Sequence, residues 1–235
     1  RKEAIRDIGS NSVRKLYLAH RGAFYEALMG GIILVPEGMY DFEWLSLWQR
    51  LAQSSPDSAT SFSLRPITIL PTCDAALVES FQEISKFRPD AIPVVDGDTA
   101  GAGYLNQLIS ATPSPSKVAR YGDGAGAEYL AVWILEPALA EPGSALGTLL
   151  PSPADRTLRA LQDALADGTA KKDRELRENL VWESLATAEC CNRACEFFHD
   201  LAAIAFGEQR KNSRWTVDTK PSGTKVFAAA HIRRA

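Results

Sequence analysis

Residues 31–44 have the sequence GIILVPEGMYDFEW, which predicts a buried strand followed directly by a helix. The aliphatic run from Ile32 to Val35 ends at Pro36, as expected for a buried strand that stops at a turn. Beyond Asp41, the large apolar residues fall on one face of a helix: Trp44, Leu45, Trp48, Leu51 and Ala52. Glu37 and Asp41 therefore lie at the carboxyl end of a strand, where open α/β sheets bind their ligands.

The two acids of this segment point to a cation. Glu37 and Asp41 are separated by Gly38, which leaves room for close approach of a backbone or ligand. Two carboxylates in one crevice repel each other unless a positive charge lies between them. Either acid could instead cap the helix that begins near Phe42, because carboxylates are favoured in a first helical turn.

Strand and helix patterns alternate along the rest of the first half of the chain. Strands are expected at residues 67–70, 91–95 and 118–121, the last of them at an edge of the sheet, and helices at residues 75–86, around residues 104–108, and at residues 129–139. This alternation indicates βαβ units and a mainly parallel sheet. The glycine-rich residues 121–126 match no phosphate-binding motif and are predicted to form a turn.

The remaining segments define the expected domain organisation. Residues 1–30 are predicted to be a helical connector, with a break at residues 9–12, and residues 31–150 the α/β core, with loops at residues 53–63 and 142–153. Residues 151–206 carry three helical patterns and are predicted to be a helical insertion. Residues 207–235 would return to the core.

A second acidic motif follows the strand at residues 91–95. Asp96 and Asp98 flank Gly97 and leave an extended backbone on the same side. Together with Glu37 and Asp41 they make four carboxylates at the carboxyl ends of two parallel strands. The four carboxylates can meet if the two strands are neighbours in the sheet. Oxygen-only ligand sets suit Mg²⁺ or Mn²⁺, which commonly bridge to phosphate.

These two motifs resemble a known family. Glu37-Gly38-x-x-Asp41 followed by Asp96-Gly97-Asp98-x-Ala100-Gly101 resembles the Toprim fold of bacterial-type primases, topoisomerases and several nucleases. The lead-in from His20-Arg21 to Glu26-Ala27-Leu28 is similar to that of the OLD (overcoming lysogenization defect) family, and this resemblance covers nearly the whole chain. In that family a Toprim nuclease follows an ABC-type ATPase. No GxxxxGK[ST] motif occurs here, so the ATPase half would be absent from this chain.

The resemblance implies a metal-dependent DNA endonuclease and assigns its residues. The metal ligands would be Glu37, Asp41, Asp96, Asp98 and a later acid, for which Glu136 is preferred to Glu141. Glu37 would also be catalytic, and so would a lysine before a small apolar helix near the carboxyl end. Lys225 fits that lysine best and Lys220 second. Two Mg²⁺ or Mn²⁺ ions would serve the hydrolysis of a phosphodiester.

The overall charge gives little support for nucleic-acid binding, so the basic residues must be considered locally. The 235 residues carry a net charge of −3 and a pI near 5.7. Residues 207–235 are locally basic, with seven Lys or Arg against two acids, and would supply phosphate contacts. No apolar run approaches the ~20 residues that span a bilayer. We therefore expect a cytoplasmic fragment of a longer protein, which could dimerise at full length.

Two other functions and one other metal site stay open. Asp96 after an apolar strand is also typical of aspartyl phosphatases, although their usual Thr or Val is replaced by Ala100. Alternatively, the chain is a non-catalytic dimerisation or docking module that uses its helical insertion. The four cysteines form no disulfide framework. Cys191, Cys195 and His199 have helical spacing and could bind zinc, but a packed helix face is the favoured interpretation.

Overall fold

The sheet is central, mainly parallel and mixed only at one edge. The computed structural model describes residues 4–54, 66–208, 210 and 213–233. Within these residues, the sheet has the order β2-β1-β3-β4-β6-β5, and only the β5–β6 pair is antiparallel. The strands are β1 (Ile32–Pro36), β2 (Ile67–Ile69), β3 (Ile92–Val95), β4 (Lys117–Tyr121), β5 (Trp215–Thr219) and β6 (Lys225–Ala229). The α/β class and the mainly parallel sheet agree with the sequence prediction.

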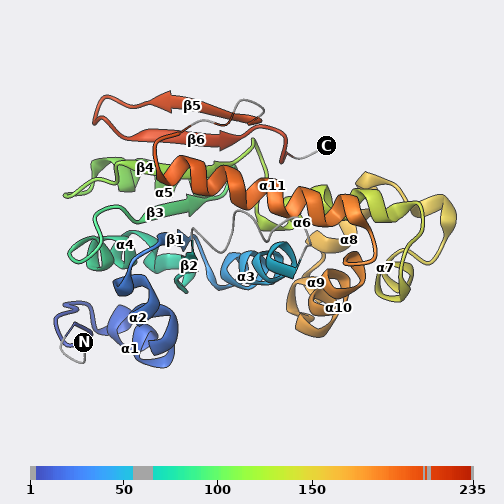
Figure 1. The fold of residues 1–235 in the computed structure, drawn as a ribbon, viewed down its shortest axis with the longest axis horizontal. Coiled ribbons are helices and arrows are strands. Elements are labelled where there is room, and N and C mark those ends of the chain that lie inside the picture. Colours follow the sequence, from blue (N-terminus) through green and yellow to red (C-terminus); the bar gives the residue numbers. More distant parts are fainter. Residues whose placement is uncertain (1–3, 55–65, 209, 211–212, 234–235) are drawn as a thin grey trace.

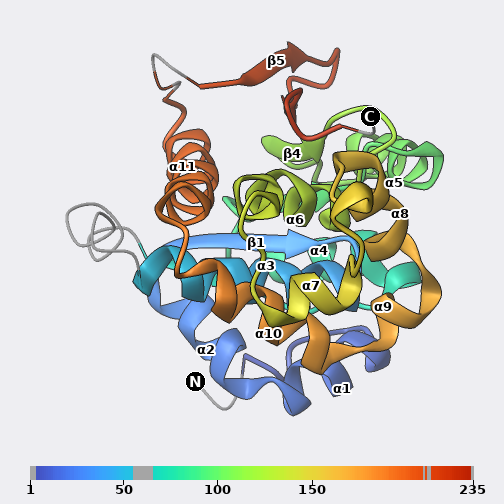
Figure 2. The ribbon, with the colours of Figure 1, turned by 90° about the vertical axis from the view of Figure 1, so that its right-hand side faces the viewer.

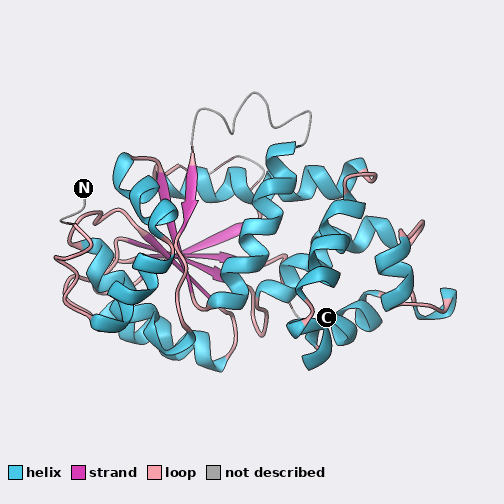
Figure 3. Ribbon diagram, turned by 90° about the horizontal axis from the view of Figure 1, so that it is seen from below, coloured by secondary structure: helices cyan, strands magenta, loops and turns pink. Residues whose placement is uncertain are grey.

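Both faces of the sheet are covered, which explains why its strands are almost continuously apolar. In β1, Ile32 and Leu34 belong to one hydrophobic core, while Ile33 and Val35 belong to the other. The period-2 alternation of a strand thus divides its side chains between two helical layers. Figure 3 shows the strands enclosed by helices.

One face packs against the amino-terminal helices and the two crossover helices that follow β2 and β3. These are α1 (Asn11–Ala19), α2 (Arg21–Met29), α4 (Leu77–Ser85) and α5 (Thr99–Ser110). The other face packs against α3 (Met39–Ser54), α6 (Ala127–Leu135) and α11 (Ala188–Ala205). In α3 the tryptophans Trp44 and Trp48 are fully buried and stacked, with ring centroids 5.6 Å apart.

A helical lobe lies beyond the carboxyl ends of the strands. It contains α7 (Ser144–Leu149), α8 (Leu158–Ala166), α9 (Gly168–Lys172) and α10 (Arg174–Ser184). In Figure 1 the arrowheads of β3 and β6 point toward this lobe, and α11 runs back from it along the sheet. In the view of Figure 2, α7 and α10 lie below the arrow of β1, and α8 and α9 lie to its right. Short 3₁₀ turns occur at Asp74–Ala76, Glu136–Leu139 and Pro153–Asp155.

Several predicted elements differ from the structure. Strand β4 is internal rather than at an edge, because β6 pairs with it from Lys117 to Tyr121. Helix α7 occupies part of the predicted loop at residues 142–153, where the Glu183 carboxylate accepts hydrogen bonds from Ser144 Oγ and the Ala145 amide, each 2.9 Å long. The predicted insertion holds four α-helices instead of three. Most of the predicted loop at residues 53–63 lies outside the described residues.

The segment after Lys225 is the most consequential difference. The family resemblance implies a small apolar helix there, but residues 225–229 form β6. Pairing with β4 on one side and with β5 on the other determines this choice, and a five-residue apolar run cannot reveal it. Among the described residues, no helix combines the length and apolar character needed to cross a membrane.

Candidate functional site

The two acidic motifs meet at the carboxyl edge of the sheet. Strands β1 and β3 are neighbours, with Pro36 opposite Val94. Glu37 Oε2 accepts a hydrogen bond of 2.9 Å from the backbone amide of Asp96. The chain passes from β1 to β2 on one side and then crosses from β2 to β3 on the other side of β1, so this pair lies at the topological switch point where doubly wound sheets bind ligands. Residues 59 positions apart are thereby in direct contact.

Asp41 comes from the first turn of α3 and is only 7% exposed. The backbone of Gly38 and of Asp41 itself acts to lower the pKa of this carboxyl, against the larger effect of burial. The amide groups at the start of a helix have no intrahelical partners, and they favour a negative charge. The helix-capping interpretation is therefore correct in part, but Asp41 also faces other carboxylates.

A further carboxylate, Glu128, joins this cluster although it was not expected there. Glu128 is in the first turn of α6, and its side chain is 14% exposed. A Cβ at Gly126 would lie 2.9 Å from both Asp96 Oδ2 and Glu128 Oε2, so both carboxylates approach the same glycine. Glu128 follows β4 just as Asp41 follows β1. An acid in the first helical turn after the next parallel strand was the signal that could have identified it.

Close backbone packing holds the β3–α5 and β4–α6 turns together. The Gly97 amide donates to the Ala125 carbonyl at 2.6 Å, and the Gly124 amide donates to the Gly97 carbonyl at 3.0 Å. A Cβ on Gly97 would collide with the backbone oxygen of Gly122. The glycine of the second motif is therefore required by packing, and the glycine-rich turn at residues 121–126 brings Glu128 to Asp96.

Asp98 has a different environment from Asp96. It is exposed and caps α5, because its Oδ1 accepts a hydrogen bond of 2.8 Å from the Gly101 amide. Asp98 therefore stands at the rim of the cluster, near enough for its charge to add to the raised pKa of Asp96. Asp98 thus serves as the N-cap of α5.

Crowding of the carboxylates changes their acidity. Burial, then the negative charges of Glu37 and Glu128, raise the pKa of Asp41 well above its ordinary value. Burial followed by the charges of Asp41, Glu37 and Glu128 raises the pKa of Asp96 further. The folded protein thus disfavours full ionisation of this pair when no cation is present, and a positive ligand would reverse that effect.

The cluster fits a hard divalent cation in its chemistry. Asp96 Oδ1 is buried and has no hydrogen-bond partner, so one carboxylate oxygen remains available to a ligand. Glu37, Asp41, Asp96 and Glu128 offer oxygen donors only, as Mg²⁺ and Mn²⁺ prefer. In the described parts of the chain, no three or more His, Cys, Asp or Glu side chains are already arranged around one ion position. Side-chain adjustment would therefore accompany binding.

Glu136 is not brought to this cluster. Its carboxylate pairs with Arg193 Nη1 at 2.6 Å, and its side chain is 40% exposed. Eight residues separate it from Glu128, which corresponds to about 12 Å along a helix. The structure therefore places Glu128, rather than the expected Glu136, beside Asp96.

The two candidate catalytic lysines lie at the opposite end of the strands from the acids. Lys225 begins β6 opposite Lys117, whereas the acid edge is where Ala229 pairs with Tyr121. Four residues of strand correspond to about 13 Å, more than a lysine side chain can span. Lys220, in the β5–β6 turn, pairs with Asp218 Oδ2 at 2.6 Å. Neither lysine is brought to the acids, because β6 enters the sheet from the opposite end.

The expected basic tail is largely compensated by acids. Arg210 pairs with the buried Asp200 at 3.1 Å, and Arg214 lies 4.0 Å from Glu196. Lys220 has its own acidic partner, as described above. Lys211 and Arg234 are outside the described residues. Of the five described basic residues of this segment, three therefore lie next to acids: Arg210, Arg214 and Lys220.

The cysteines serve packing. Cys190, Cys191 and Cys195 are buried in α11, and Cys73 is exposed. Cys195 Sγ lies 3.3 Å from the carbonyl oxygen of Ala52 in α3. The thiols therefore fill the interface between α11 and its neighbours, and the zinc interpretation gains no support from the described side chains.

No protein-family model, curated protein or solved structure matches this chain. The fold and the acidic site therefore provide the basis for a functional assignment. The fold is α/β with a mainly parallel sheet and flanking helices, which is compatible with a Toprim-like arrangement.

Proposed function

We propose that this chain is the catalytic part of a divalent-metal-dependent DNA endonuclease. The observation that carries this proposal is the contact between Glu37 Oε2 and the Asp96 amide. It joins two acidic motifs at the switch point of the sheet, beside an unpartnered oxygen of Asp96. A bound cation explains four neighbouring carboxylates, two of them buried, with fewer assumptions than four separate structural roles do.

The position of each residue in the cluster indicates its proposed role. Glu37, Asp41, Asp96 and Glu128 would hold the metal, and Asp98 would contribute from the rim. Bound Mg²⁺ or Mn²⁺, as one ion or two, supplies positive charge that stabilises the attacking and leaving oxygens of a phosphodiester. Asp41 projects from the first turn of α3, where the backbone amides at the start of the helix favour a negative charge. The turns at Gly97 and Gly126 fix the distance between the carboxylates of β3 and α6.

The family resemblance supports DNA as the substrate. Both acidic motifs that carry the resemblance to the OLD-family Toprim nucleases meet in one cluster. Under this proposal an ATPase region would regulate cleavage in the longer protein, which would act in the cytoplasm and could dimerise.

The alternatives have less support. An aspartyl phosphatase uses an ionised Asp as nucleophile, whereas the surroundings of Asp96 raise its pKa through burial and neighbouring acids. A purely docking role for the helical lobe leaves unexplained why its Lys171 lies 3.9 Å from Glu128.

Replacement of the second acidic motif tests the proposal. The double variant Asp96→Ala, Asp98→Ala should lose at least about 100-fold in Mn²⁺-dependent cleavage of supercoiled plasmid, because metal catalysis supplies several kcal/mol. Circular dichroism should show an unchanged fold, and EDTA should abolish cleavage by the wild type. Plasmid nicking by the double variant at the wild-type rate would refute the assignment of these acids.

A further inference from the structure

A lysine from the helical lobe reaches the acid cluster. Lys171, in the last turn of α9, has its Nζ 3.9 Å from Glu128 Oε1 and 5.3 Å from the centre of the Tyr40 ring. Tyr40 is next to Asp41 on α3. The ammonium group thus lies between the two helices that carry Asp41 and Glu128. Among the residues that the structure describes, Lys171 is the one lysine whose ion pair joins it to this cluster.

The position of Lys171 is fixed by a buried arginine. Arg177 of α10 has a side chain only 4% exposed, and its Nη1 donates to the carbonyl oxygen of Lys171. Its Nη2 pairs with Glu43 of α3. Its guanidinium also lies 5.3 Å from the centre of the Tyr40 ring. The end of α9 is therefore tied to α3, the same helix that positions Asp41.

Charge and exposure suit Lys171 to a ligand. The side chain is 42% exposed, so its ammonium group is accessible from solvent while it faces the acids. A polyanionic substrate would be repelled by the carboxylates unless a cation stood at their rim. Lys220 and Lys225 cannot serve this purpose, because they lie at the opposite end of the strands.

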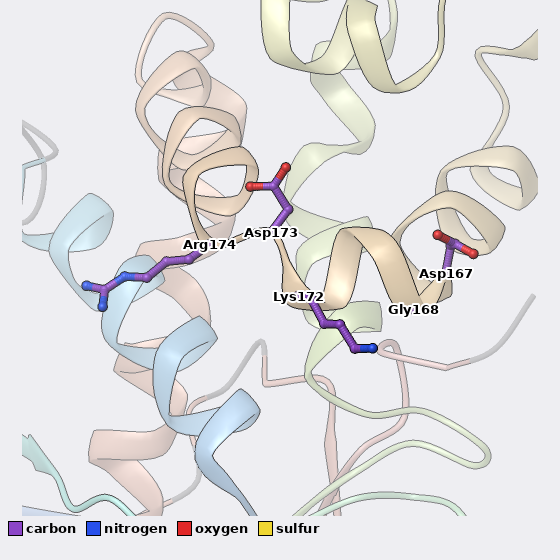
Figure 4. Close-up of a pocket in the computed structure, with 5 residues that line it drawn as sticks. All are labelled: Asp167, Gly168, Lys172, Asp173 and Arg174. Atoms are coloured by element: carbon purple, nitrogen blue, oxygen red, sulfur yellow. The ribbon is translucent and has the colours of Figure 1, made fainter.

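The neighbouring hollow on the outside of the lobe is a weaker candidate. It is shallow, and it is lined by Asp167, Gly168, Lys172, Asp173 and Arg174. Figure 4 shows that Lys172 and Arg174 point in different directions, with two carboxylates beside them. Arg174 is also paired with Glu178 at 2.9 Å. The hollow does not converge on one ligand, whereas Lys171 faces the acid cluster.

We propose that Lys171 forms an anion subsite at the rim of the acid cluster and contacts a phosphate of the nucleic-acid backbone there. This inference rests on the proposed function for the identity of the substrate. The helical lobe then contributes directly to the substrate site. Such a contact with a phosphate positions the substrate and carries no sequence information.

Binding of a fluorescein-labelled DNA duplex tests the subsite independently of cleavage. Anisotropy would be measured in Ca²⁺ over a range of salt concentrations. Lys171→Gln removes the charge and keeps a polar side chain that is one atom shorter. We expect roughly threefold to tenfold weaker binding and a salt slope reduced by about one unit. Lys171→Arg should restore binding. Lys15→Ala, on exposed α1, is the matched control and should bind as the wild type does.

The outcomes separate this inference from the proposed nuclease. Equal affinity and equal salt slope for wild type and Lys171→Gln would overturn the subsite, even if the wild type cleaves DNA. Absence of wild-type binding to the duplex would overturn both proposals. Binding that depends on Lys171, with no Mn²⁺-dependent cleavage, would support the subsite and refute the nuclease. A thermal midpoint of Lys171→Gln within about 2 °C of the wild type would confirm an intact fold.

Discussion

At the scale of single residues, the decisive feature is the crowding of carboxylates around Asp96. Its amide donates to Glu37, its side chain approaches Gly126 beside Glu128, and one of its oxygens has no partner. A folded protein keeps such a group at a cost in free energy, because burial and like charges both oppose ionisation. That cost is consistent with selection for a bound cation rather than for stability.

Glu128, in the first turn of α6, and Glu136, just after the end of α6, distinguish the observed cluster from the expected one. Glu128→Gln should reduce Mn²⁺-dependent DNA cleavage by at least about tenfold, because it removes a ligand charge beside Asp96. Glu136→Gln should leave cleavage close to the wild-type rate, because Glu136 pairs with Arg193. Initial rates of plasmid nicking at several Mn²⁺ concentrations provide the measurement. Loss of cleavage in Glu136→Gln with normal cleavage in Glu128→Gln would reverse the assignment.

The raised pKa of Asp96 leads to a prediction about stability. Unfolded aspartate ionises near pH 4. Above that pH the unfolded chain binds fewer protons than the folded chain, so the free energy of unfolding falls as pH rises toward the folded pKa. Asp96→Asn removes this penalty. At pH 7 in EDTA we expect the variant to be more stable by about 1–3 kcal/mol, and this difference should shrink toward pH 4.

Urea unfolding at both pH values measures this effect, and Mn²⁺ provides its control. Addition of Mn²⁺ should raise the unfolding midpoint of the wild type more than that of Asp96→Asn, since a ligand stabilises the state that binds it. If the variant were less stable than the wild type at pH 7 in EDTA, Asp96 would be a stabilising residue and the electrostatic argument would be wrong.

At the scale of elements, the connection between α10 and α3 matters most. Arg177 and Glu43 bridge these helices, and Arg177 also lies 6.0 Å from the centre of the Trp44 ring. A buried ion pair contributes little net stability, but loss of one partner leaves a buried charge without compensation. This arrangement is better explained as fixing the position of α9 than as a source of stability.

Removal of the acidic partner should therefore have a measurable effect. Glu43→Gln should lower the free energy of unfolding by about 1–3 kcal/mol, because Arg177 stays buried with a weaker partner. Glu178→Gln, which removes the partner of the exposed Arg174, is the matched control and should change stability much less. Urea denaturation of both variants makes the comparison. Equal effects would show that burial of Arg177 is unimportant.

At the scale of the whole molecule, the strand order determines where chemistry can occur. Strand β1 lies between β2 and β3, so the crossovers that leave β1 and enter β3 pack on opposite faces of the sheet. A crevice forms where they diverge. The helical lobe lies beyond this edge (Figure 1) and brings Lys171 to the crevice. The opposite end of the strands carries Lys225 and the β5–β6 turn, far from the acids.

The sequence by itself determined the features that depend on local pattern. The aliphatic run of β1 and the acids that follow it predicted a strand end with Glu37 and Asp41, because strand and helix periodicities differ. The same reasoning placed Asp96 and Asp98 after β3. Only the tertiary structure decided that Glu128, rather than Glu136, lies beside Asp96. It also decided that Lys225 lies at the amino-terminal end of β6, away from the acids. Those outcomes depend on strand order and direction, which arise from packing between distant segments and leave no local periodicity.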